Sequence, residues 1–213
     1  MTHEPVSVFE TFVTPARKHL TEAVRHLIDA VLTTESVGDA ALDSAAGRVE
    51  GVVAELTGAM PDKRTARRER VERTHADYLA RSPVLGAVSP LAPPVPATWD
   101  GETLMLTGQF STACEGPPGY VHGGWIAMAF DEALGFAAVA AGHPGMTGKL
   151  VTKYRRPTPV ITDIRIRAWL ENANGRIATM RCELLVGEEI TAEGEGLFIE
   201  IGEELARQYF GDE

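Results

Sequence analysis

The sequence predicts an α+β fold in which an antiparallel sheet wraps around one central helix, with a helical extension at the amino terminus. Three observations predict it. Apolar residues recur at every third or fourth position in the first 60 residues, they alternate beyond residue 100, and one long apolar segment, residues 119–142, interrupts the alternating part. A strand, a helix and then strands joined by short turns is an order that allows an antiparallel sheet to pack on a single helix.

The first 60 residues carry two amphipathic helical patterns, over residues 8–34 and 39–58. Gly38 lies between them, and Gly58 and Pro61 end the second pattern. We therefore expect a helical hairpin. The apolar positions that define its two stripes are Leu20, Val24, Leu27, Ile28 and Val31, followed by Leu42, Ala46, Val49, Val53 and Leu56.

A basic segment and a proline-rich segment follow the expected hairpin. Residues 62–81 have a local net charge of +3 in a chain whose net charge is −10. Residues 82–98 are rich in proline and hold no charge, which predicts an extended connector. We accordingly divide the chain into a helical extension (1–82), a connector (83–98), a sheet-and-helix domain (99–203) and a carboxy-terminal tail (204–213).

Alternation of apolar and polar residues predicts five strands in the sheet-and-helix domain. The Asn174-Gly175 pair and Gly187 are suited to the tight turns between the later strands. The expected strands lie within residues 104–110, 149–159, 161–172, 176–187 and 191–201.

Composition excludes several classes of function. The net charge of −10 argues against general nucleic-acid binding, which needs a basic surface. The two cysteines have no metal-ligand or disulfide spacing, so we expect no metal site and a reducing, cytoplasmic setting. The amino terminus lacks the pattern of a secretory signal. The long apolar segment contains Asp131 and Glu132, and each carboxylate would cost about 2.5–3.5 kcal/mol in a bilayer, so no membrane partner is expected.

The segment CEGPPGYVHGGWIAMAFDEALG, residues 114–135, resembles the motif that opens the central helix in hotdog-fold acyl-CoA thioesterases of the phenylacetate-thioesterase (PaaI) type. The resemblance covers residues 84–201. It implies a hotdog fold, an acyl-CoA substrate and no cofactor besides the coenzyme A of that substrate. Several relatives carry Asn or Gln in the loop before the His-Gly-Gly, where this chain has Glu115 and Gly116.

The resemblance also implies roles for single residues. Asp131 matches the catalytic carboxylate, Gly124 the backbone donor to the thioester carbonyl, and Thr147 the hydroxyl residue that supports the attacking water. His122 and Gly123 complete the His-Gly-Gly motif.

Elementary chemistry supports this assignment. The first N–H groups of a helix have no partner within the helix, so a helix that opens with glycines can bind a developing oxyanion. Asp131, in an apolar helix, is expected to be buried, and loss of solvation would make its carboxylate a better proton acceptor.

The spacing of the two groups adds a prediction about assembly. Gly124 and Asp131 are separated by seven residues, which is about 10 Å along a helix axis. One carboxylate cannot easily cover that span to a carbonyl held at its own helix start. We therefore expect the donor and the acid to come from two subunits of a homo-oligomer, a dimer or a dimer of dimers.

Other roles stay open for these side chains. Asp131 could be a structural acid, and Glu132, about 100° further around the helix and beside the substrate, is the rival carboxylate. His122 could be a general base, but it is better suited to fixing the loop by hydrogen bonding. Thr147 could simply pair in a strand. A nucleophile formed by Cys114 and His122 has no third group to orient it.

Further residues are assigned to substrate binding. Arg155 and Arg156 are placed to meet the coenzyme A phosphates, or else they are only a surface strand end. The basic segment of residues 63–81 could steer the same phosphates or be a solvated helix face. Trp125 is either core or the lining of an acyl tunnel.

Three alternative functions are weighed, and the second of them, a hydratase, is set aside. The chain could be a non-catalytic acyl-CoA-binding or sensing module. It could be a hydratase, although Phe136 occupies the position where that chemistry usually needs His. Finally, the amino-terminal helices could bind protein while the remainder only dimerises.

Overall fold

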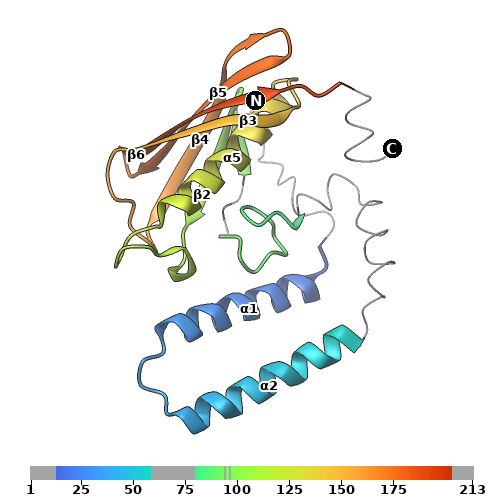
Figure 1. Cartoon of the computed structure of the whole chain (residues 1–213), viewed down its shortest axis with the longest axis vertical. Helices are drawn as coiled ribbons and strands as arrows, with labels where there is room; N and C mark the ends of the chain where they lie inside the picture. Colours follow the sequence, from blue (N-terminus) through green and yellow to red (C-terminus); the bar gives the residue numbers. More distant parts are fainter. Residues whose placement is uncertain (1–12, 59–79, 94, 96, 203–213) are drawn as a thin grey trace.

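The computed structural model describes residues 13–58, 80–93, 95 and 97–202. It contains a six-stranded antiparallel sheet, in the order β1-β2-β4-β5-β6-β3, wrapped around one long helix, α5. Two amino-terminal helices, α1 and α2, lie below this body in Figure 1. The predicted α+β architecture is confirmed.

The amino-terminal hairpin consists of α1 (Pro15–Thr33) and α2 (Asp39–Gly58). Thr14 caps α1, because its hydroxyl accepts a hydrogen bond from the Arg17 N–H at 3.2 Å. The Gly38 carbonyl accepts the first backbone hydrogen bonds of α2. Both predicted helices are thus present, but the first covers residues 15–33 of the predicted range 8–34, of which residues 8–12 lie outside the described residues.

The sheet contains one strand more than the sequence predicts. The additional strand, β1, forms a hairpin with β2 and begins at Ala97, two residues before the predicted domain start. It is only four residues long, so it holds too few alternations to reveal a period. The strands are β1 (Ala97–Asp100), β2 (Thr103–Gln109), β3 (Met146–Tyr154), β4 (Asp163–Asn174), β5 (Ile177–Val186) and β6 (Glu189–Ile199).

The expected extended connector is instead a series of turns packed on the core. Residues 81–91 consist largely of turns, closed by bonds such as that from the Val88 N–H to the Ala80 carbonyl at 2.9 Å. Val84, Leu85 and Val95 are buried with the sheet and helix. Proline excludes regular helix here, as expected, but the apolar residues between the prolines pull the segment inward.

Helix α5 (Gly123–Ala140) fills the concave side of the sheet and contacts β2, β3, β4, β5 and β6. It is the one helix in the described part of the chain that is long and apolar enough to cross a membrane. However, seven of its residues, among them Phe130 and Leu134, are buried in the core. A Cβ on Gly194 of β6 would lie 2.7 Å from the Phe130 ring, so this glycine lets the sheet approach the helix.

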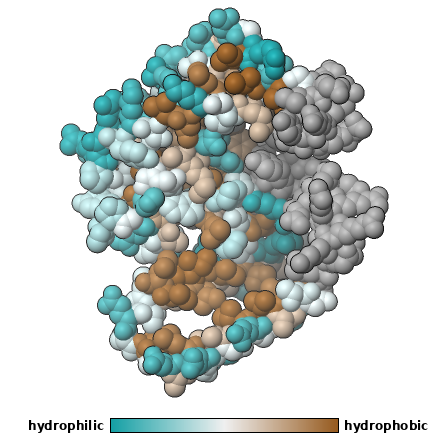
Figure 2. Space-filling model, viewed as in Figure 1, coloured by the Kyte–Doolittle hydropathy of each residue, from teal (hydrophilic) through white to brown (hydrophobic). Residues whose placement is uncertain are grey.

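The hairpin exposes much of its apolar surface. Helix α1 reaches the body through Thr112, whose hydroxyl donates to Asp29, and through Arg25, which donates to the Ser89 carbonyl. Helix α2 has no buried residue. Brown apolar atoms gather over α1 and along α2 in Figure 2. The exposed large apolar residues of the hairpin are Leu20, Leu27, Val31, Leu32, Val37, Leu42, Val49, Val52, Val53 and Leu56.

Candidate active site

The glycine-rich start of α5 is organised by His122. This residue is the N-cap of the helix, and its Nδ1 accepts a hydrogen bond from the Gly124 N–H at 3.0 Å. The imidazole therefore caps the helix start, and the predicted hydrogen bond from His122 that fixes the loop stays a prediction. The same contact occupies the N–H group expected to polarise a thioester carbonyl, so a substrate oxygen must share this N–H or displace the imidazole from it.

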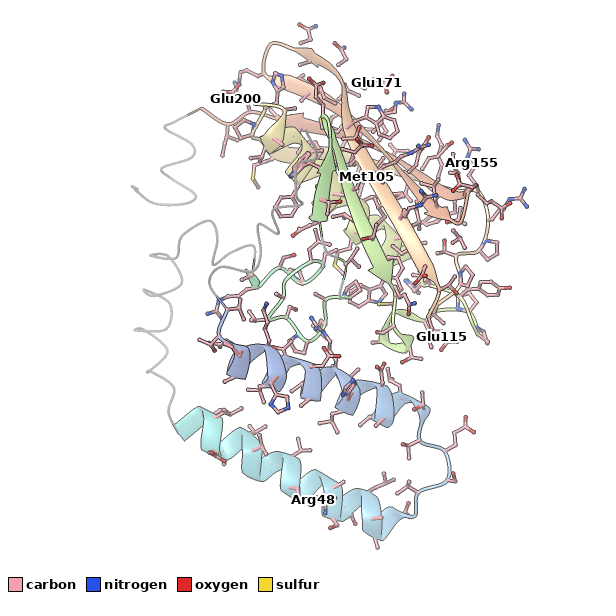
Figure 3. The ribbon with its side chains drawn as sticks, turned by 180° about the vertical axis from the view of Figure 1, so that it is seen from behind. Arg48, Met105, Glu115, Arg155, Glu171 and Glu200 are labelled. Atoms are coloured by element: carbon pink, nitrogen blue, oxygen red, sulfur yellow. The ribbon has the colours of Figure 1, made fainter. Side chains whose placement is uncertain are left out.

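The loop before α5 is folded tightly against His122. The His122 N–H donates to the Cys114 carbonyl, and the Gly116 N–H donates to the Tyr120 carbonyl, both at 2.8 Å. A Cβ on Gly116 would lie 2.8 Å from the His122 Cα, so the loop needs glycine there. The Glu115 carboxylate accepts from the Gly119 N–H of its own loop. Figure 3 labels Glu115, which lies between the sheet and α1 in that view.

Asp131 and Thr147 are brought together, as their predicted roles require. The Thr147 hydroxyl donates to Asp131 Oδ1 at 2.8 Å, from β3 to the middle of α5. The pairing of β3 with β6 shifts its register between Thr147 and Lys149, a β-bulge next to the hydroxyl. A bulge redirects the side chains around it.

The predicted burial of Asp131 is wrong for the single chain, because its side chain is only half-buried. Its neighbour Glu132 turns toward the 80–93 segment, where the hydroxyl of the buried Ser82 donates to its carboxylate. Desolvation raises the pKa of Glu132, the Ser82 hydrogen bond lowers it, and the charge of Asp131 raises it further, with a net upward shift. The two adjacent acids therefore have different surroundings.

The arginines expected to bind phosphate are engaged in ion pairs. Arg155 contacts Glu193 and Arg156 contacts Glu189, both at 2.6 Å and both on β6. The four side chains are at least one-third exposed, so these pairs are of the weak surface type. Their role toward coenzyme A stays a prediction. Of the basic segment, residues 63–79 lie outside the described residues.

The thiol of Cys114 does not resemble an activated nucleophile. It is fully buried, and desolvation raises its pKa to about 11, so it remains protonated at neutral pH. Trp125 is half-buried and packs against the core cluster. Among the described residues, no group of three or more His, Cys, Asp or Glu could hold a metal ion.

Two contacts at the site have partners that the sequence did not reveal. Ser82 belongs to a proline-rich segment that gives no sign of reaching Glu132. Tyr154, at the end of β3, donates from its hydroxyl to the Gly123 carbonyl at 2.7 Å. The position of Tyr154, an aromatic residue at the end of an alternating strand, was the sequence feature that could have pointed to its contact. No local pattern predicts the contact of Ser82 with Glu132.

A cavity of about 380 Å³ lies away from these residues, between α1 and the end of β2. Its lining contains none of the predicted site residues. It is formed by Asp29, Thr33, Gln109, Phe110, Ser111, Thr112 and Ile161.

Comparison with known families covers the region just described. Residues 118–193, from the loop before α5 to the middle of β6, match the thioesterase superfamily. These residues are therefore similar to a thioesterase-superfamily domain over about a third of the chain. The matched region contains His122, Gly124, Asp131 and Thr147, so the resemblance noted from the sequence is confirmed.

Individual relatives extend the comparison beyond residues 118–193. A solved thioesterase superfamily protein aligns over 88% of this chain and 92% of its own, with 29% identity and a TM-score of 0.78. Because the alignment covers 88% of this chain, the structural similarity includes much of the chain outside residues 118–193. Zebra fish thioesterase superfamily member 2, at 18% identity and a TM-score of 0.50 over 57% of this chain and 92% of its own, shares the fold.

Curated relatives are similar over a shorter stretch. The acyl-coenzyme A thioesterase THEM4 of Mus musculus is 33% identical over 92 residues, 42% of this chain and 40% of the mouse protein. The Xenopus laevis protein of the same name is 33% identical over 89 residues, 41% of this chain and 40% of its own length. The match thus spans about two-fifths of these relatives.

Proposed function

We propose that the protein is an acyl-CoA thioesterase that hydrolyses an acyl-CoA to the free acid and coenzyme A. The observation that carries the proposal is the 2.8 Å hydrogen bond from Thr147 to Asp131, which holds a carboxylate on the helix that opens with His122-Gly123-Gly124. The similarity of this region to proteins named acyl-coenzyme A thioesterase supports the choice of substrate class. The proposal needs no metal and no cofactor.

Asp131 supplies the base or the nucleophile. One carboxylate oxygen accepts from Thr147, and the other takes a proton from water as the water oxygen bonds to the thioester carbon. The carbonyl oxygen becomes an oxyanion, which then re-forms the carbonyl as the C–S bond breaks and the thiolate leaves. In the alternative route the carboxylate attacks directly and the resulting anhydride is hydrolysed. Under single-turnover conditions in labelled water, label in Asp131 identifies the second route, because it arises only when water opens the anhydride at the Asp131 carbonyl.

The oxyanion donor is the Gly124 N–H of a second subunit. About 10 Å of helix axis separates Gly124 from Asp131, so one carbonyl cannot meet both in the same chain. Two further features support a second subunit. Strand β3, which carries Thr147, is at an edge of the sheet, and half-buried residues of α5 such as Trp125 and Met128 leave the helix incompletely covered.

A non-catalytic acyl-CoA-binding module is the second candidate. It is favoured by the hydrogen bond between the Gly124 N–H and His122, since this bond keeps the donor from a thioester oxygen while it persists. Such a module would bind acyl-CoA without turnover.

The test is hydrolysis of a panel of short, long and aryl acyl-CoAs, followed with a thiol reagent, by wild type, Asp131→Asn and Thr147→Val. We expect Asp131→Asn to abolish most turnover while acyl-CoA binding by calorimetry persists. Thr147→Val should lower kcat about 10- to 100-fold, because a hydrogen bond to a charged group contributes about 1.5–3 kcal/mol. Thr152→Val, on the same strand, is the matched control and should match wild type.

The results distinguish the thioesterase from the non-catalytic binding module. Turnover by wild type that survives in Asp131→Asn would remove Asp131 from the reaction. Tight binding without turnover across the whole panel would favour the binding module.

A further inference from the structure

The peptide group between Gly123 and Gly124 is held at both of its polar ends. Its carbonyl, on Gly123, accepts a hydrogen bond from the Tyr154 hydroxyl at 2.7 Å. Its N–H, on Gly124, donates to His122 Nδ1 at 3.0 Å. This N–H is the donor that the proposed function requires, so Tyr154 acts on the opposite end of the same dipole.

The contact with Tyr154 depends on glycine at position 123. A Cβ added to Gly123 would lie 3.0 Å from the Tyr154 hydroxyl oxygen and 3.1 Å from the ring carbon that bears it. A side chain at this position would therefore push the hydroxyl away from the carbonyl. The first glycine of the His-Gly-Gly motif is thus needed for the hydrogen bond with Tyr154, whether or not a substrate approaches it.

The strand end that carries Tyr154 is itself fixed. Tyr154 is opposite Ala192 in the pairing of β3 with β6. Directly after it, the N–H groups of Arg155 and Arg156 both donate to the Thr191 carbonyl, at 2.8 and 3.0 Å. The side chains of both arginines reach back to glutamates of β6. The position of the tyrosine ring at the helix start is therefore set by the sheet.

A hydrogen bond accepted by a peptide carbonyl strengthens the N–H of the same peptide group, because the two dipoles polarise each other. We propose that Tyr154 is a positioning residue which orients and polarises the Gly123–Gly124 peptide, so that the Gly124 N–H binds the developing oxyanion more strongly. This inference rests on the proposed function and adds to it a residue that does not touch the substrate. Because the oxyanion forms only during the reaction, Tyr154 raises kcat and leaves KM unchanged.

The test compares Tyr154→Phe, which keeps the ring and removes the hydroxyl, with Tyr120→Phe in the neighbouring loop as the matched control. We expect Tyr154→Phe to lower kcat about 3- to 10-fold at constant KM, the range for one neutral hydrogen bond. Tyr120→Phe should keep the wild-type kcat. Gly123→Ala should also lower kcat, and its effect should not add to that of Tyr154→Phe, since both act through one contact.

A second readout does not need turnover. In the free protein, the amide proton of Gly124 should move upfield in the NMR spectrum of Tyr154→Phe and stay in place in Tyr120→Phe. An unchanged kcat in an active enzyme, equal losses in the two phenylalanine variants, or an unmoved Gly124 amide would each overturn the inference. An inactive wild type with a shifted Gly124 amide would instead overturn the proposed function and leave the polarisation of the peptide standing.

Discussion

Asp131 and Glu132 are adjacent in the chain, yet they contact different parts of the molecule. Asp131 meets Thr147 of the sheet edge, whereas Glu132 meets Ser82 of the turn segment. The carboxyl of Glu132 is partly withdrawn from water, and its pKa is raised above the ordinary value of 4.5. We therefore assign the reaction to Asp131 and a structural role to Glu132.

The raised pKa of Glu132 predicts a change in the pH dependence of stability. The folded state holds this proton more tightly than the unfolded state, so Glu132 destabilises the fold progressively as pH rises above about 4.5. Glu132→Gln removes the titrating group and retains an acceptor for Ser82. In urea unfolding between pH 4 and pH 8, the free energy of unfolding of the variant should increase relative to that of wild type as the pH rises.

Glu102→Gln, in the exposed turn between β1 and β2, is the control and should follow wild type at every pH. A difference in the free energy of unfolding between Glu132→Gln and wild type that stays constant from pH 4 to pH 8 would contradict the assigned environment of Glu132.

The sequence predicted some of these side-chain contacts and missed others. The family resemblance implied the roles of Asp131 and Thr147, and a hydrogen bond joins the two side chains in the structure. The pairing of Ser82 with Glu132 spans 50 positions in the chain, and that of Tyr154 with Gly123 spans 31. Contacts over such separations depend on how elements pack, which no local pattern encodes.

For the segment of residues 80–93, composition predicts that no regular helix forms, but it does not predict where the segment packs in the fold. Its prolines exclude regular structure, and the prediction of an extended connector followed from them. Val84 and Leu85 nevertheless bury their side chains, and Ser82 accepts hydrogen bonds from the N–H groups of both, at 3.1 and 3.2 Å. Five of the six strands, in contrast, were predictable because each repeats its alternation over several residues, whereas β1 is too short to do so.

Ser82 is expected to stabilise this segment and its contact with α5. Ser82→Ala leaves two buried N–H groups and one carboxylate without their partner, which should lower the free energy of unfolding by about 1–3 kcal/mol. Denaturant unfolding measures the loss. Ser89→Ala, in the same segment, is the control, and an equal effect of the two substitutions would show that the Ser82 contacts contribute nothing specific.

The assembled molecule is needed to complete the site in this account. A single chain offers two half-sites on α5, the glycine start and the carboxylate, about 10 Å apart along the axis. In a twofold dimer each site takes the donor from one subunit and the acid from the other. The exposed apolar hairpin of α1 and α2 supplies neither of these two half-sites.

Subunit complementation tests the shared site most directly. Gly124→Pro removes the donor N–H at a first-turn position that tolerates proline, and Asp131→Asn removes the acid. Each variant alone should be nearly inactive. Co-expression with two different affinity tags yields mixed dimers, in which one of the two sites draws its Gly124 and its Asp131 from unaltered positions. Purified mixed dimers should recover about half of the wild-type kcat, whereas mixed dimers as inactive as their parents would contradict the account.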